Sequence, residues 1–377
     1  MRYTAFLLLL VFKAIVAIEP VELRVSDKLK NDFTPINKTF YNDPVEINEL
    51  FTSLRSSSKT YCEMVVKNRR WNKSLAYAHI SPSSFPEYSR SCQHCNNSIM
   101  AGCWNFFKMN DRRPDRDFKL IKMIYNQKDH DCYSVGFLQP YIMHNEIGCH
   151  SITMLDFDWK ILDAHWQFIQ LLRNRALVNP YTFDMNLAKL KLSYVAFDDD
   201  ANKPEVAATM KILCKNRQRE ECRAFISKFQ STVENVNQFR FNLSSLHEAD
   251  YRNNGSGRIK VIFLSNAIED IYTSKEDFES LLKHLHYSMN TDEKAVLVHH
   301  AGGHLGFGIY EFKRKADGNQ ISTLCKDKYR NTVRARPGIY YETYFEEVTI
   351  SKKKTITTCE ALLKQKEKQA AAFESHR

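Results

Sequence analysis

The chain has 377 residues, and 43% of them are hydrophobic, which is enough for a sizeable core and excludes an intrinsically disordered protein. This length suits one large domain with additions or two domains. There are 54 basic and 44 acidic residues, a net charge of +10. No aromatic residues interleave with the tightest basic clusters, which argues against nucleic acid as a partner. These clusters, lysines 352–354 and lysines 364, 366 and 368, form either a solvated face or a weak contact with an anionic surface.

Residues 1–17 have the pattern of a signal peptide. Arg2 precedes an apolar run over residues 5–12, and small or apolar residues follow to Ala17, where cleavage is expected. The run is too short to span a bilayer. Because Lys13 interrupts the apolar segment, an uncleaved anchor and a chance apolar start remain alternatives. No later stretch resembles a transmembrane helix, so we expect a secreted, lumenal or periplasmic protein.

Cysteine usage agrees with export. An even number of cysteines behind a leader indicates disulfides, although their pairing cannot be read from sequence. The ten cysteines are Cys62, Cys92, Cys95, Cys103, Cys132, Cys149, Cys214, Cys222, Cys325 and Cys359. Asn-X-Ser/Thr triplets would be glycan acceptors in a eukaryotic protein. They begin at Asn37, Asn72, Asn96, Asn242 and Asn254.

Residues 18–130 form a cysteine-containing N-terminal region of mixed character. Its densest feature is Cys92-Gln-His-Cys95, followed by Cys103. A zinc site that used His94 or a distant fourth ligand is one interpretation. No second pair at similar spacing is present, so we favour disulfides in an oxidising compartment, and we expect these three cysteines to be oxidised.

A strand over residues 133–138 and a second over residues 151–155 are the first two elements of a predicted parallel sheet. The second is apolar with little alternation, as expected of a strand buried on both faces, and it ends in Asp156 and Asp158. A helical pattern then begins, for which Asp158 suits the N-cap position. Gly136 is the sole glycine near the end of the first strand, where a common nucleotide site has several.

The third core strand has two candidates, residues 190–197 and residues 238–243. We prefer the second because it leaves a short crossover to the next strong strand. Residues 181–236 then become an insertion, which is largely helical over residues 205–236. This insertion would cover the mouth of the sheet, the opening at the carboxyl ends of its parallel strands.

Later segments continue the alternation of strand and helix. Residues 259–266 are a buried strand, and the sequence from Thr273 to Glu276 has the pattern of a capping box before a helix. Residues 295–299 form a further strand, residues 339–350 a late strand or hairpin, and residues 351–377 a basic helical tail. Together these elements predict an α/β fold with a doubly wound, mostly parallel sheet, an N-terminal extension and a helical insertion.

This order of elements over residues 131–350 resembles the Rossmann-like core of class I S-adenosylmethionine-dependent methyltransferases. The segments that carry the resemblance are TMLDFDW, VIFLSNAIEDIY and AVLVHHAGG. The resemblance implies that Gly136 lies under the methionine part of S-adenosylmethionine and that Asp156 or Asp158 holds the ribose hydroxyls. It also implies that Leu243 and Ser244 border the adenine, and that Asn266 faces the substrate.

Each of these residues also has a simpler interpretation. Asp156 is a carboxylate near helix N-termini, where a negative charge is favourable in any case, and Asp158 is a helix cap. Asn266 can bridge backbone groups in a turn.

His299 and His300 end a strand and are candidates for a general base in methyl transfer. A metal site with His304 is the alternative. Adjacent histidines on a strand point to opposite faces, so at most one of them can join His304, and we expect no metal.

Two functions from different classes follow. The first is methyl transfer from S-adenosylmethionine to an unknown acceptor, in which the fold holds donor and acceptor in line. The second is a secreted, disulfide-braced binding protein that keeps the fold as a non-catalytic scaffold. No nucleophile elbow, phosphate loop or glycosidase-type pair of carboxylates stands out in the sequence.

Overall fold

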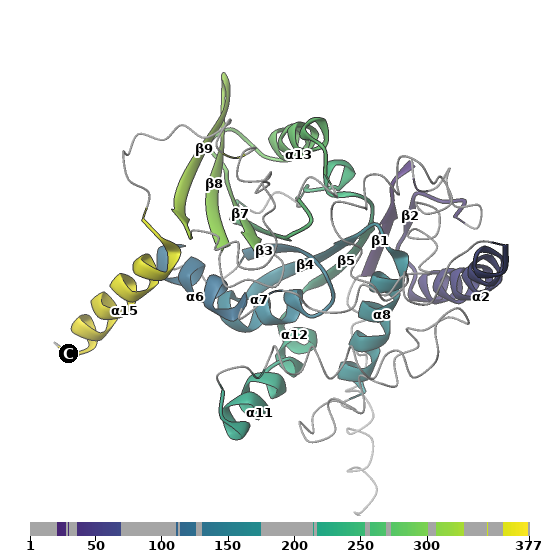
Figure 1. The fold of residues 1–377 in the computed structure, drawn as a ribbon, viewed down its shortest axis with the longest axis horizontal. Coiled ribbons are helices and arrows are strands. Elements are labelled where there is room, and N and C mark those ends of the chain that lie inside the picture. Colours follow the sequence, from purple (N-terminus) through teal and green to yellow (C-terminus); the bar gives the residue numbers. More distant parts are fainter. Residues whose placement is uncertain are drawn as a thin grey trace, which may run out of the picture.

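The fold is built on one sheet. A computed structural model describes residues 21–27, 29, 36–68, 111, 114–125, 130–174, 214, 217–252, 257–268, 273–300, 307–327, 345 and 357–375. These residues form a nine-stranded sheet in the order β2-β1-β5-β4-β3-β6-β7-β8-β9, with helices around it (Figure 1). The α/β class expected from the sequence is therefore confirmed.

The strands run in one direction through the centre of the sheet. β1, β5, β4, β3, β6 and β7 are parallel, whereas β2 and the β8–β9 hairpin add antiparallel edges. The five strands from β3 to β7 lie side by side in the order β5-β4-β3-β6-β7. If they are numbered one to five along the chain, this order is 3-2-1-4-5, which is typical of a doubly wound sheet. The direction in which successive strands are added reverses between β3 and β6. The bounds are β1 Val21–Val25, β2 Phe40–Tyr41, β3 His130–Val135, β4 Cys149–Asp156, β5 Gln238–Leu243, β6 Lys260–Ser265, β7 Lys294–His300, β8 Phe307–Lys315 and β9 Gly318–Lys326.

Helices cover both faces because the central strands are apolar on both sides. Val261 and Phe263 of β6 join the core that includes α6, α7, α8, α11 and α12, whereas Ile262 and Leu264 join the core with α13. The helices are α2 Pro44–Asn68, α6 Pro114–Tyr125, α7 Gln139–Ile147, α8 Trp159–Arg173, α11 Arg219–Ser227, α12 Gln230–Asn235, α13 Lys275–Tyr287 and α15 Cys359–Ser375, with the 3₁₀ helix η2 at Leu246–Glu248.

The order of the core strands agrees with the preferred sequence interpretation. β5 spans Gln238–Leu243, the second of the two candidates, and pairs in parallel with β4. Residues 190–197 lie outside the described part of the chain. The first strand lies earlier than expected, because Gly136 takes a φ of 78° and turns the chain away from the sheet. Residues predicted as strand end therefore lead into α7, a helix that the sequence interpretation did not include.

The helix after β6 begins one residue later than predicted. Ser274, not Thr273, is the N-cap of α13, and its hydroxyl accepts from the Asp277 N–H while the Asp277 side chain accepts from the Ser274 N–H. Thr273 instead donates its hydroxyl to the Ala267 carbonyl at 2.7 Å. The capping box is real, but its members are Ser274 and Asp277.

The predicted insertion is described only in its last part. Residues 217–236 form two short helices, α11 and α12, where one long helix was expected. The Asn237 N–H, directly after α12, donates to the His150 carbonyl at the beginning of β4. This part of the insertion therefore lies at the amino ends of the strands and does not cover the mouth, which is at their carboxyl ends.

The β8–β9 hairpin was not anticipated from the sequence. Lys315 pairs with Gly318 across a tight turn formed by Ala316 and Asp317, and the dipeptide Asp317-Gly318 is a turn signal that could have indicated it. The late strand predicted over residues 339–350 lies outside the described residues, except for Phe345.

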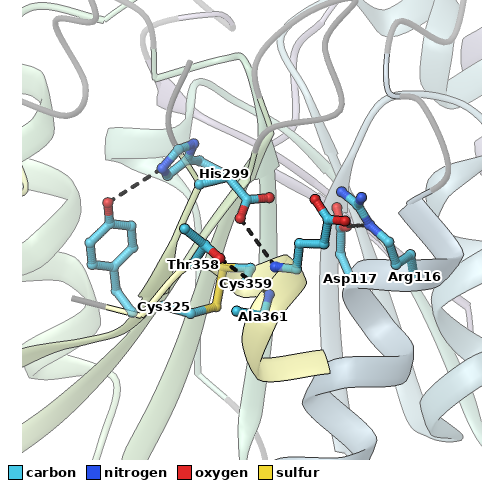
Figure 2. Close-up of a disulfide and its surroundings, with 10 residues drawn as sticks. Arg116, Asp117, His299, Cys325, Thr358, Cys359 and Ala361 are labelled. Atoms are coloured by element: carbon cyan, nitrogen blue, oxygen red, sulfur yellow. Dashed lines mark hydrogen bonds and ion pairs between the residues drawn. A yellow bond between two sulfur atoms is a disulfide. The ribbon is translucent and has the colours of Figure 1, made fainter. Parts of the chain in front are cut away.

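Disulfides brace the sheet at several points, as expected for six of the ten cysteines. Cys132 of β3 is joined to Cys149 of β4, and Cys214 to Cys222. Cys325 of β9 is joined to Cys359, the first residue of α15, so the C-terminal helix is tied to the sheet (Figure 2). The proposed leader and Cys92, Cys95 and Cys103 lie outside the described residues. Within the described part, none of the helices is both long and apolar enough to cross a membrane.

Candidate functional site

A pocket opens at the carboxyl ends of the parallel strands, where the strand order reverses. Gly136 after β3, Asp156 at the end of β4, Ser244 after β5 and Asn266 after β6 all line it. Ligands of open α/β sheets bind at this place. Four of the residues singled out from the sequence are thus brought together. The lining also includes Asp111, Gln139, His247, Ser265 and Thr273, which the sequence interpretation missed.

The loop after β3 is held from behind by a buried histidine. His165 of α8 lies 3.0 Å from the Gly136 carbonyl through Nε2 and 3.1 Å from the Tyr141 hydroxyl through Nδ1. Burial lowers the pKa of His165 to about 3, so the ring is neutral. Its Nε2–H then donates to the carbonyl and Nδ1 accepts from the tyrosine, so both nitrogens are paired.

Asp156 ties the ends of β3 and β4 together. Its carboxyl accepts from the Asp158 N–H at 2.9 Å and interacts with the backbone N–H groups of Gly136 and Phe157. Burial, with the nearby charge of Asp158, raises the pKa of Asp156 to about 8, and these N–H groups oppose the shift. The carboxyl is therefore largely protonated at neutral pH, a form that both donates and accepts hydrogen bonds.

Asp158 and Leu243 do not line the pocket. Asp158 is the N-cap of α8, and its Oδ1 accepts from the Lys160 N–H at 3.0 Å. Burial raises its pKa to about 6, against the opposing charge of Lys160. The side chain of Leu243 is buried in the core that includes β5. For these two residues the structure shows a structural role.

The wall after β5 consists of residues 244–247. The Ser244 N–H donates to the Asp156 carbonyl at 3.0 Å, and its hydroxyl to Asn242 Oδ1 at 2.9 Å. His247 Nε2 lies 3.3 Å from both Ser245 Oγ and Asp277 Oδ1. His247 lies shortly after the carboxyl end of β5, and Asp156 is the last residue of β4. A search for polar side chains at the carboxyl ends of all predicted strands would therefore have included His247.

The wall after β6 contains a backbone outlier. Ser265 has a φ of 49°, which is rare for a residue with a side chain, and the pairing of β6 with β7 shifts register just before it. Its hydroxyl lies 2.8 and 2.9 Å from the two carboxyl oxygens of Asp111. This turn places Asn266 at the pocket.

Asp111 is the centre of a buried acidic cluster beside the pocket. Gln139 Nε2 donates to its Oδ2 at 2.9 Å, and His300 Nδ1 lies 3.4 Å from its Oδ1. His300 Nε2 in turn lies 3.6 Å from Oδ2 of Asp117. Asp111, Asp117 and His300 have no exposed surface, and burial raises the pKa of Asp117 well above its usual range, against the charge of Arg116. No local sequence pattern marks Asp111, because it precedes α6 and belongs to no strand.

His299 and His300 point to opposite faces of β7, as expected from their adjacency. His299 stacks with Tyr310 and Phe345, and its Nε2 lies 3.4 Å from the Tyr310 hydroxyl. Burial lowers its pKa well below the usual value. Gly308 is required beside it, because a Cβ there would lie 2.4 Å from the ring. Neither histidine is among the lining residues, and His300 contacts one of them, Asp111.

The described lining residues of the pocket suit an uncharged or cationic ligand that forms hydrogen bonds. The lining residues within the described part of the chain include no lysine or arginine, although the whole chain is basic. Phosphate groups are usually bound by such side chains or by clustered backbone amides in a glycine-rich loop. In the described part of the chain, no group of three or more His, Cys, Asp or Glu side chains is arranged to hold a metal ion.

Comparison with known proteins adds no assignment. No protein-family model matches the sequence, and the sequence matches none of the curated proteins with which it was compared.

Proposed function

We propose that this pocket binds S-adenosylmethionine and that the protein transfers its methyl group to an acceptor. The observation that carries the proposal is the convergence of Gly136, Asp156, Ser244 and Asn266 on one pocket at the reversal of strand order. These residues follow four different strands. A resemblance of element order alone implied that they would meet around a nucleoside.

The chemistry of the lining fits this cofactor. The protonated carboxyl of Asp156 suits ribose hydroxyls, since it can donate to one and accept from another. Ser244 and Leu246 offer a polar and an apolar border for the adenine. The described lining residues include no lysine or arginine, which suits a nucleoside without phosphates and a ligand that carries positive charge.

When bound, S-adenosylmethionine supplies an electrophilic methyl group. The residues of this chain would hold the donor, exclude water and keep an acceptor beside Asn266, and such positioning accounts for much of the rate in an in-line displacement. His300 is fully buried and is not among the lining residues, so it is not placed to take a proton directly from an acceptor in the pocket. Its contact with Asp111 supports a positioning role.

The second candidate is a non-catalytic, exported binding protein. The disulfides within the sheet and between the sheet and α15 favour it, because persistent disulfides are typical of oxidising compartments, and S-adenosylmethionine is a cytosolic cofactor. In this case the same pocket would bind another ligand with hydrogen-bonding groups.

Isothermal titration of the full chain with S-adenosylmethionine, S-adenosylhomocysteine and ATP separates the two. We expect micromolar dissociation constants for the first two, roughly −8 kcal/mol, and much weaker binding of ATP. Asp156→Ala should abolish nucleoside binding, whereas the control Asp292→Ala, at an exposed ion pair away from the pocket, should not. No heat at millimolar nucleoside, from a protein shown to be folded, would favour the second candidate.

A further inference from the structure

The side chain of Gln139 has a fixed orientation in the pocket wall. Gln139 is the first residue of α7 and turns back over Gly136, where any Cβ would lie 2.8 Å from its amide. Its Nε2 donates to Asp111 Oδ2 at 2.9 Å. The opposite amide orientation would place Oε1 against a carboxyl oxygen, two acceptors in contact. Asp111 therefore determines which way the amide points.

This orientation leaves one acceptor without a donor. Gln139 is 4% exposed, and its Oε1 is buried with no hydrogen-bond partner in the part of the chain that the structure describes. A buried acceptor without a partner destabilises a protein. Such atoms are rare and often mark the place of a ligand. Because Gln139 lines the pocket, a ligand in the pocket can supply the missing donor.

The surroundings favour a cationic donor over a neutral one. The carboxyl group of Asp111 lies directly against the Gln139 amide, and the described residues that line the pocket include no lysine or arginine. A protonated primary amine brings three N–H donors and a positive charge. A hydroxyl could satisfy Oε1 as well, but it would gain nothing from the nearby Asp111 carboxyl.

We propose that Gln139 Oε1 accepts a hydrogen bond from a protonated amine of the ligand, and that Gln139 makes this pocket select nucleosides bearing an amino group on the 5′ substituent. The inference rests on the proposed nucleoside site and names its specificity residue. Asp111 acts behind it as a positioning residue, since it holds both Gln139 after β3 and Ser265 at the end of β6.

Three thioether nucleosides test the proposal with the full chain by isothermal titration. S-adenosylhomocysteine carries an amine and a carboxylate, S-adenosyl-3-thiopropylamine carries only the amine, and 5′-methylthioadenosine carries neither. In Gln139→Met the two amines should bind about tenfold more weakly than in the wild type, as expected for loss of one hydrogen bond to a charged group. Binding of 5′-methylthioadenosine should stay within about twofold and serve as the internal control for folding.

A second measurement needs no variant. The wild type should bind S-adenosyl-3-thiopropylamine about tenfold more tightly than the analogue in which a hydroxyl replaces the amine. Equal affinity for these two ligands, or an equal loss for all three nucleosides in Gln139→Met, would overturn the inference while leaving the nucleoside site in place. If none of the nucleosides binds, the proposed function fails, and the inference fails with it.

Discussion

Two buried polar clusters contact the same loop, residues 136–139, and they differ in how completely they are paired. The rear cluster, around His165, does not line the pocket, whereas the front cluster, around Asp111, does. Behind the loop, both ring nitrogens of His165 are occupied by the Gly136 carbonyl and the Tyr141 hydroxyl. In front of it, Asp111 gathers Gln139, Ser265 and His300, yet Gln139 Oε1 has no partner among the described residues.

The difference indicates a division of roles. A fully paired, neutral cluster rigidifies the backbone and needs no ligand. An acidic cluster with a buried acceptor left over is costly in the empty protein and becomes satisfied only when a donor arrives. The rear cluster therefore acts as scaffold, and the front cluster is the part of the loop that a ligand would contact.

Breaking the rear cluster should have the largest effect on stability. His165→Ala removes a buried ring and leaves the Gly136 carbonyl and the Tyr141 hydroxyl without their partner. We expect the free energy of unfolding to fall by about 3 kcal/mol in urea denaturation at pH 7. The control His284→Ala, at an exposed position on α13, should change it by less than about 0.5 kcal/mol. If the two variants have equal effects on stability, His165 does not act as a scaffold for this loop.

His165 and Asp156, which both contact Gly136, should respond to pH in opposite directions. The pKa of His165 is lowered from 6.5 to about 3, so the folded state disfavours the proton and stability falls as the pH drops through this range. The pKa of Asp156 is raised from 3.8 to about 8, so the folded state favours the proton and stability falls as the pH rises through that range.

Asp156→Asn should imitate the protonated carboxyl and reduce the loss at high pH by roughly 2 kcal/mol. Part of the loss of stability at high pH will remain in this variant, because burial also raises the pKa of Asp117. The loss of stability at low pH should not change. The measurement is the free energy of unfolding between pH 4 and pH 9. If the free energy of unfolding decreases above pH 7 as much in the variant as in the wild type, Asp156 is already ionised at neutral pH.

A helix cap gives the scale of an ordinary local interaction. Ser274→Ala removes the acceptor of the Asp277 N–H at the start of α13 and should cost about 1 kcal/mol. The neighbouring exposed Glu276→Ala, which removes no part of the observed cap, should cost less than half of that. If Glu276→Ala destabilises the protein more than Ser274→Ala does, the capping pair is Thr273 and Glu276, as the sequence pattern predicted.

Much of the core could be predicted because its signals are local. The apolar runs of β4, β6 and β7 and the cap at Asp158 depend on neighbouring residues in the chain. The β8–β9 hairpin was missed although Asp317-Gly318 is a local signal too. The shift of the capping box by one residue shows the limit of such patterns, since Thr273 and Ser274 are equally suited to the position.

The sequence by itself determined the parallel strands, their polar carboxyl ends and the opposite directions of His299 and His300, because strand periodicity is a property of consecutive residues. Only the tertiary structure decided which polar groups meet. Asp111 comes from a segment with no strand pattern and reaches the pocket because the core on that face of the sheet packs α6 against α7 and β6. The same packing determines that His300 faces two carboxyl groups while His299 faces aromatic rings, since contacts between distant segments leave no periodic trace in the chain.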